Sequence, residues 1–110
     1  MSMSRHMRLM VFFDLPVRTK EQRKTATAFR NWLLKDGYYM LQYSVYVRLC
    51  NGSDAAEKHT QRLLVNAPYT GSVRVLAVTE KQYATIKIIA GKKRPEEKSA
   101  KDFQISFFVD

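Results

Sequence analysis

The stretch Arg8-Leu-Met-Val-Phe-Phe-Asp14-Leu-Pro16 decides the fold. Five consecutive apolar residues, 9–13, precede one carboxylate and a proline, and a run this short predicts a strand that is covered on both faces. Proline cannot continue a central strand, so we expect the strand to end near Asp14. Asp14 is the only acidic residue among the first twenty, and active groups of α/β architectures gather at such strand ends. The alternative is that Asp14 only caps a turn or pairs with Arg8 or Arg18.

The length and composition of the chain limit its class. A chain of 110 residues is enough for one domain and not for two. Its apolar runs are far shorter than a membrane span, and no signal-peptide pattern opens the chain, so we expect a cytoplasmic protein without a membrane partner. The single cysteine, Cys50, excludes an internal disulfide and a thiolate metal cluster, and we interpret it as a small apolar core residue.

Charge is the most informative property of the composition. Nineteen Lys and Arg residues against ten Asp and Glu give a net charge of +9, which favours nucleic acid or an anionic membrane surface as a partner. Between positions 18 and 35 the basic residues cluster, and Glu21 is the only acidic one. This clustering favours nucleic acid, whereas the alternative is a helix face that is only solvated. The predicted nucleic-acid contacts are Arg18, Lys20, Arg23, Lys24 and Arg30.

Residues 19–22, Thr-Lys-Glu-Gln, match a capping box in which Thr19 is the N-cap and Gln22 reaches back to it. A helix should run from there to Asp36, because apolar residues recur at steps of three and four. The expected apolar face is Ala26, Phe29, Trp32 and Leu33. Gly37 then stands where a glycine usually ends a helix.

Residues 38–50 show the clearest alternation of the chain, which predicts either one long strand or two strands separated by a bend. One face would carry Tyr39, Leu41, Tyr43, Val45, Val47 and Leu49, and the other would carry Met40, Gln42, Ser44, Tyr46 and Arg48. The second face is too polar for a core and too aromatic for free water. We therefore predict that Gln42, Ser44 and Tyr46 contact another protein surface.

The rest of the chain completes a known unit. Asn51-Gly52 marks a turn, a second helix should begin near Asp54 and end before Pro68, and residues 72–79 alternate as a strand. A short helical turn at 80–85 and an apolar segment at 86–90 follow. The order strand, helix, long or doubled strand, helix, strand matches the α+β, ferredoxin-like βαββαβ unit.

The last part of the chain predicts an additional strand. A polar linker, 91–102, separates the core at about 8–90 from residues 103–109, which alternate again. A ferredoxin-like sheet is complete without this segment, so it must pair elsewhere. Pairing with the edge of a second copy would cover both edges and give a homodimer with exchanged strands. We therefore add Phe103, Ile105 and Phe107 to the predicted dimer interface.

Several short segments in this order are also found together in a known family. They are Val11-Phe-Phe-Asp-Leu-Pro16, then Phe29 and Leu33 before Gly37, Gln42-Tyr-Ser-Val-Tyr46, Gly71, and Thr79-Glu-Lys-Gln82. On these residues the chain resembles the small CRISPR-associated protein of the spacer-acquisition machinery, the partner of the CRISPR integrase. It is most similar to members from systems that are built on a single large RNA-guided nuclease.

The resemblance implies a ferredoxin-like homodimer whose two sheets pack face to face and whose C-terminal strands are exchanged. It also implies that the dimer bridges two integrase dimers and binds protospacer duplex DNA. Several family members are described as metal-dependent nucleases on RNA or DNA, and Asp14 matches their metal-linked aspartate. Many members carry a basic residue two positions before the glutamine of residues 42–46; here that residue is Met40, which argues against efficient cleavage.

The chemistry that Asp14 could support is limited. A single carboxylate per chain cannot build a two-metal site, but Mg²⁺ can be held by one or two carboxylates together with waters and phosphates. Two Asp14 residues that face each other across a dimer axis would meet this minimum, and Mn²⁺ should serve as well. We expect DNA bridging to be the main role, with single-stranded RNA as a further candidate ligand.

Two alternative functions use the same fold. An RNA-recognition module would need aromatic residues on its third strand, and residues 72–79 contain none. A small-molecule regulatory domain of ferredoxin-like shape is disfavoured by the charge of +9.

Overall fold

The computed structural model describes residues 6–91, and the predicted order of elements is confirmed. The elements are β1 (His6–Asp14), α1 (Lys20–Lys35), β2 (Tyr39–Gln42), β3 (Val45–Asn51), α2 (Ser53–Asn66), β4 (Ser72–Thr79) and the single turn α3 (Glu80–Tyr83). The strands form one sheet in the order β2-β3-β1-β4, and all neighbours are antiparallel. This is the ferredoxin-like α+β core. The predicted strand at 103–109 lies outside the described residues, as does the linker beyond Gly91.

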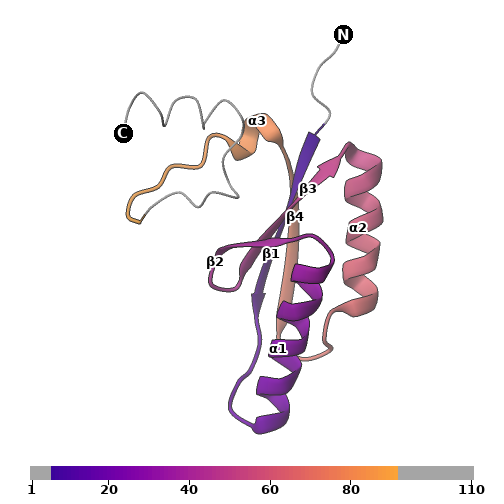
Figure 1. The fold of residues 1–110 in the computed structure, drawn as a ribbon, viewed down its shortest axis with the longest axis vertical. Helices are drawn as coiled ribbons and strands as arrows, with labels where there is room; N and C mark the ends of the chain where they lie inside the picture. The colour runs from indigo at the N-terminus through magenta and orange to yellow at the C-terminus, as the bar shows by residue number, and fades with distance from the viewer. Residues whose placement is uncertain (1–5, 92–110) are drawn as a thin grey trace.

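The two long helices, α1 and α2, both lie on the same face of the sheet (Figure 1). α1 begins as predicted, because the Gln22 amide donates to Thr19 Oγ1 at 3.0 Å and the Thr19 amide donates to Gln22 Oε1 at 3.0 Å. After the helix, Gly37 has a φ of +98°, a conformation that glycine adopts without steric cost. No helix within residues 6–91 has both the length and the apolar composition to cross a membrane.

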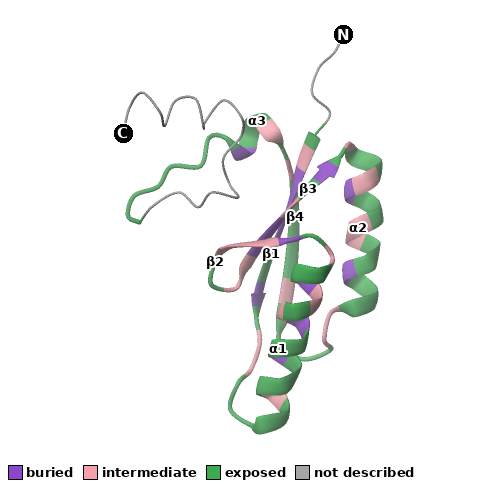
Figure 2. Cartoon of the chain, in the orientation of Figure 1, coloured by how far each residue is buried: buried purple, intermediate pink, exposed green. Residues whose placement is uncertain are grey.

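The main core fills the space between the helices and the sheet. Leu9, Val11 and Phe13 of β1 are all buried there. Phe13 packs edge-on against Phe29 of α1, with ring centroids 5.2 Å apart. Figure 2 shows the same division of each helix into a buried side and an exposed side. The other members of this core are Leu33, Tyr38, Tyr46, Cys50, Ala56 and Leu63, so Cys50 is a core residue, as predicted.

Residues 38–50 form a hairpin, and its outward face differs from the predicted one. β2 ends at Gln42, the register shifts between Met40 and Gln42, and Ser44 turns the chain with a φ of 67°. Tyr46 is only 4% exposed and its ring lies 5.6 Å from that of Phe13, beneath the helices. The prediction that Tyr46 contacts another protein is therefore wrong. The helices cover the face of the hairpin that carries Tyr46, because the Tyr46 ring packs with Phe13 in the core between the helices and the sheet.

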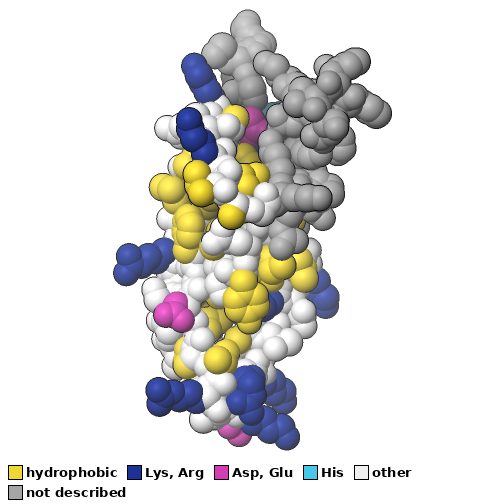
Figure 3. Space-filling model, turned by 90° about the vertical axis from the view of Figure 1, so that its left-hand side faces the viewer, with side chains coloured by type: hydrophobic (Ala, Val, Ile, Leu, Met, Phe, Trp, Pro, Cys, Tyr) yellow, Lys and Arg dark blue, Asp and Glu magenta, His cyan; other side chains and the backbone are white. Residues whose placement is uncertain are grey.

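The opposite side of the hairpin belongs to what we call the open face of the sheet. Along β1 it carries Met10 and Phe12, paired with Val47 and Val45 of β3 and with Leu76 and Arg74 of β4. Met10 and Val47 are buried beside Tyr83 of α3, whereas Phe12, Leu49 and Leu76 are 36%, 44% and 51% exposed. The prediction that both faces of β1 are covered is thus confirmed on the helix side and, on the open face, at Arg8 and Met10, whereas Phe12 is exposed. Figure 3 shows hydrophobic side chains running down the middle of this face.

Candidate functional site

Asp14 is the last residue of β1 and its side chain is exposed. Because strand side chains alternate, Asp14 lies on the same face as Met10 and Phe12, which is the open face. It pairs in register with Ser72 of β4. The turn before β4 packs tightly on this strand end, since a Cβ atom at Gly71 would lie 2.5 Å from the Asp14 carbonyl oxygen. The backbone at Asp14 is therefore fixed while its carboxylate faces solvent.

Asp14 could provide only part of a metal site. Within residues 6–91, no three His, Cys, Asp or Glu side chains gather where they could hold an ion. Asp14 alone fits one of the oxygen ligands that Mg²⁺ takes, so the remaining ligands would have to come from a second subunit, water or phosphate. Pairing of Asp14 with Arg8 is excluded, because Arg8 forms its ion pair with Glu80.

The predicted cations divide into two groups. Arg18, Lys20 and Lys24 are exposed where α1 begins, only a short loop after Asp14, and Figure 3 shows Lys and Arg side chains gathered at this lower end. Arg23 is also exposed, but its Nη1 donates to the carbonyl oxygens of Val17 and Arg18 at 3.1 and 2.8 Å. The structure therefore brings Asp14 and three exposed cations to one end of the molecule. The hydrogen bonds of Arg23 stabilise the loop between them.

Arg30 differs from the other predicted cations because its guanidinium is packed against the protein. Its Cζ lies 5.0 Å from the Phe13 ring centroid and 4.2 Å from that of Tyr43. Its Nη2 donates to Ser44 Oγ at 3.2 Å, and its Nη1 is buried without a hydrogen-bond partner among the described residues. Of the predicted interface residues on this hairpin, Gln42 is exposed and Ser44 is half-buried beneath Arg30. Phe103, Ile105 and Phe107 lie outside the described residues.

Sequence reasoning missed the ion pair between the buried Arg8 and the partly exposed Glu80 at the other end of the open face. Arg8 is 5% exposed, and it donates to both carboxylate oxygens of Glu80 and to the Tyr39 hydroxyl. Its Cζ lies 4.6 Å from the Tyr83 ring centroid, and the hydrogen bond to Glu80 raises the pKa of the guanidinium. This network fastens α3 to the sheet. No periodicity signals a pair that is 72 positions apart.

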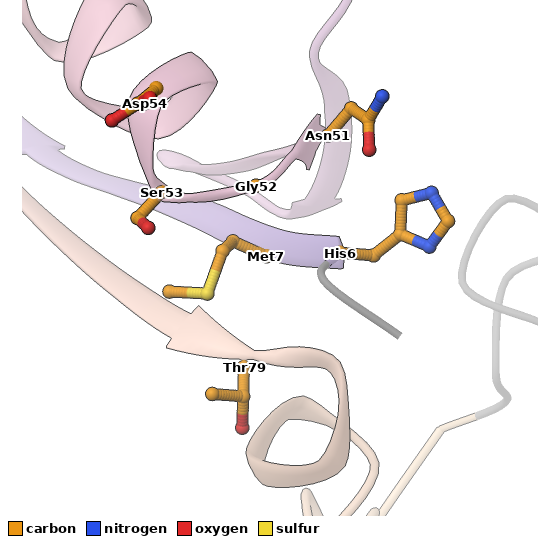
Figure 4. A pocket seen from close by; sticks show the side chains of 7 residues that line it. All are labelled: His6, Met7, Asn51, Gly52, Ser53, Asp54 and Thr79. Atoms are coloured by element: carbon orange, nitrogen blue, oxygen red, sulfur yellow. The ribbon is translucent and has the colours of Figure 1, made fainter. Parts of the chain in front are cut away.

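The sequence also gave no sign of a hollow at the end of the sheet away from Asp14, drawn in Figure 4. It has a volume of about 530 Å³ and is lined by residues from the starts of β1 and α2 and the ends of β3 and β4. These are His6, Met7, Asn51, Gly52, Ser53, Asp54 and Thr79. Asp54 is the only carboxylate among them, so the described lining offers no set of ligands for a metal ion.

Known proteins are similar in sequence to this chain over nearly all of the described residues. The family model described as CRISPR associated protein Cas2 matches residues 7–86. A CRISPR-associated endoribonuclease Cas2 from Acidovorax ebreus is 56% identical over 102 residues, which are 93% of this chain and 100% of that protein. Proteins of the same name are 40% identical in Flavobacterium psychrophilum and 45% identical in Ligilactobacillus salivarius. These matches cover 91% and 86% of this chain, and 86% and 93% of those proteins.

Proposed function

The chain belongs to the Cas2 family of CRISPR-associated proteins, and on that premise we propose that it is a CRISPR adaptation protein. As a homodimer it bridges integrase dimers, binds protospacer duplex DNA and carries a metal-dependent endonuclease site at Asp14. The observation that carries the proposal is the family match over residues 7–86. Within that match, Asp14 and a group of exposed cations lie at one end of the fold.

The open face supports the homodimer. Phe12, Leu49 and Leu76 are large apolar side chains that are left exposed on one sheet surface, and contiguous apolar surface of this kind marks an interaction site. Two copies that stack these faces would bury the patch through a symmetric contact, in which each subunit uses the same residues. Because Asp14 lies on the same face, at its edge, such stacking is compatible with two carboxylates near one axis.

The outer edge of β4 supports strand exchange. β4 is the last strand of the sheet, and a groove of about 330 Å³ runs between it and α2, lined among others by Leu63, Ala67 and Val73. We propose that residues 103–109 of a second subunit pair with this edge and place apolar side chains in the groove. The eleven positions after Gly91 can span at most ~40 Å, which is enough to reach a neighbouring subunit.

The cations at the start of α1 support the binding of nucleic acid. Arg18, Lys20 and Lys24 are exposed, and a dimer would present each of them twice. The whole dimer would carry a formal net charge of +18, because each chain carries +9. Contacts of this kind go to phosphates, so they position a duplex without reading its sequence. The described residues therefore favour binding that depends on salt and only weakly on sequence.

The nuclease part of the proposal rests on Asp14 and on the similarity to relatives that are named endoribonucleases. Two Asp14 carboxylates would be ligands for Mg²⁺ or Mn²⁺, and the metal would supply charge neutralisation at a phosphodiester. Met40 packs against the main core and provides no cation. We therefore propose that the protein hydrolyses phosphodiesters slowly and acts mainly as a scaffold.

Co-purification tests the scaffolding role directly. Tagged protein should retain the CRISPR integrase from the same genome, and a protospacer-length duplex should shift to the complex. The Asp14→Asn variant should retain both, because it alters neither the exposed apolar side chains of the open face nor the cations. Cleavage of RNA by the free protein, with no retention of the integrase in either variant, would instead identify a nuclease that acts alone.

A further inference from the structure

Tyr43 is an exposed aromatic side chain that the protein nevertheless holds in place. It lies in the turn between β2 and β3 and is 74% exposed, while its ring centroid is 4.2 Å from Cζ of Arg30. Tyr69 provides a comparison within the same chain. It is 105% exposed, and no ring or cation contact to it occurs within residues 6–91. Of these two exposed tyrosines, therefore, only Tyr43 is supported by a cation.

Arg30 can support Tyr43 because Arg30 is itself immobilised. Its guanidinium lies over the buried Phe13 ring at 5.0 Å and donates to Ser44 Oγ at 3.2 Å. No carboxylate pairs with it among residues 6–91. The positive charge is thus directed at the rings of Phe13 and Tyr43, which it attracts and holds in place.

The turn that carries Tyr43 is held in an uncommon conformation. Ser44 has a φ of 67°, which is unusual for a residue other than glycine. Two contacts stabilise it: the Ser44 carbonyl accepts from the Phe13 amide at 3.1 Å, and the Ser44 hydroxyl accepts from Arg30. Backbone strain that is maintained in this way concentrates at binding sites.

From these contacts we propose that Tyr43 is a stacking platform for an unpaired nucleobase and that Arg30 is its positioning residue. The inference rests on the proposed function, and it adds a single-stranded ligand and a contact to a base. Aromatic rings beside cations bind single strands because every unpaired base has an accessible flat face. In a duplex these faces are stacked inside the helix, so Tyr43 should distinguish single strands from duplexes.

The position of the turn links this platform to Asp14. The hydrogen bond from the Phe13 amide to the Ser44 carbonyl joins the turn to β1 one residue before Asp14. A base stacked on Tyr43 would therefore lie near the carboxyl end of β1, and its backbone would pass near the cations at the start of α1. The platform would hold a single strand at the same end of the molecule as the proposed nuclease site.

The test measures the coupling between Tyr43 and one base. Affinities are measured for a single-stranded 12-mer, for the same 12-mer with abasic positions, and for a blunt duplex of equal length. Tyr43→Ala should weaken binding of the intact single strand by roughly 5- to 100-fold, the range expected for one stacked base. The abasic strand and the duplex should bind as they do to wild type. Tyr43→Phe should behave as wild type, and Tyr69→Ala is the matched control.

Fluorescence of 2-aminopurine in the single strand, measured with the strand fully bound, reports on base stacking separately from affinity. The wild type and Tyr43→Phe should quench it on binding, and Tyr43→Ala should not. Arg30→Ala should reduce the quenching, and Arg30→Lys should restore part of it because the charge returns without the flat guanidinium.

The outcomes separate this inference from the proposed function. If the wild type binds neither strand nor duplex, the proposed function fails and the platform fails with it. If the wild type binds both and Tyr43→Ala retains its affinity for the intact single strand, only the platform is wrong. An equal loss for strand and duplex, with a change from dimer to monomer, would assign Tyr43 to a subunit contact and would also overturn the platform.

Discussion

Arg8 and Glu80 are 72 positions apart, yet they form a two-point ion pair, with Arg8 Nε 2.7 Å from Glu80 Oε1 and Nη2 2.8 Å from Oε2. The Arg8 side chain is 7% exposed and that of Glu80 is 33% exposed. The pair therefore lies at the boundary between the core and solvent, where it fixes α3 against the end of the open face.

Glu80→Gln should destabilise the protein, because it leaves the guanidinium of Arg8 buried without its counter-charge. The expected loss of unfolding free energy is about 1–3 kcal/mol, below the range for fully buried pairs because Glu80 is partly solvated. Urea unfolding measures it, with Glu57→Gln on the exposed side of α2 as the control. Equal midpoints for the two variants would show that Arg8 is satisfied by its other contacts.

Acid should destabilise the fold through the charged cluster between α1 and α2. His59 Nδ1 lies 3.5 Å from Asp36 Oδ2, and Arg62 binds the same carboxylate. Burial and the charge of Arg48 lower the pKa of His59 despite Asp36. The unfolded chain, in which histidine titrates near 6.5, then takes up the proton first. Stability should therefore fall as the pH drops below about 6.5.

Asp36 extends this acid sensitivity to lower pH. Burial raises the pKa of its carboxyl, but the hydrogen bond and charge of Arg62 outweigh burial and lower it below 3.8. This contribution is present above pH 3.8 and is lost as the pH falls through the lower value in the folded state. Unfolding midpoints measured from pH 7.5 to 5 should therefore report mainly His59. His59→Gln should flatten this part of the curve.

Leu76→Glu should convert the proposed dimer into a monomer. Leu76 is 51% exposed on the open face, opposite Met10, so a carboxylate there would be buried without a partner if two open faces stack. Sedimentation measures the change, and Leu34→Glu is the matched control because Leu34 is 52% exposed on α1, away from the open face. Dimers in both variants would exclude this face as the contact.

Lys20→Ala combined with Lys24→Ala should weaken duplex binding and its dependence on salt. Each phosphate contact that is lost should reduce the slope of log K against log salt by about 0.9. Arg23 is left intact, because its removal would also release the loop carbonyls of Val17 and Arg18. Lys58→Ala combined with Lys81→Ala, on α2 and α3, is the control of equal charge. An unchanged slope in the first variant would move the binding surface elsewhere.

Local signals predicted much of this fold. The capping box at Thr19, the glycine after α1 and the apolar run of β1 each depend on neighbours within four residues, and each is present as predicted. Alternation correctly grouped Tyr39, Leu41 and Val47 on one face. It could not show which face the helices cover, since that depends on how Tyr46 packs with Phe13 and the helices. The Tyr46 prediction failed for this reason.

The candidate site was predicted less completely than the fold. The position of Asp14 at a strand end and three exposed cations follow from sequence alone. The different role of Arg30 does not, because it depends on the hairpin turn bringing Tyr43 and Ser44 onto α1. The Arg8–Glu80 ion pair could not be predicted for a similar reason, since the two residues meet only after β1 and β4 pair in register.

Asp14→Asn tests the proposed nuclease site, because it removes a negative charge and a metal ligand while keeping the shape of the side chain. The Asp14 side chain is exposed, so the substitution should change stability by less than about 0.5 kcal/mol. Dimer formation and duplex binding should persist, since the exposed apolar side chains of the open face and the cations are unchanged. Cleavage of labelled RNA and DNA should vanish, as should wild-type cleavage in the presence of a chelator.

The control for this experiment has to exclude a contaminating nuclease. Asp54→Asn is suitable, because Asp54 is another exposed carboxylate but lines the hollow at the other end of the sheet. It should cleave as wild type, and either Mg²⁺ or Mn²⁺ should restore activity after chelation, because both accept oxygen ligands. Equal cleavage by wild type and Asp14→Asn, purified side by side, would mean that Asp14 is structural and that the hydrolysis comes from another protein.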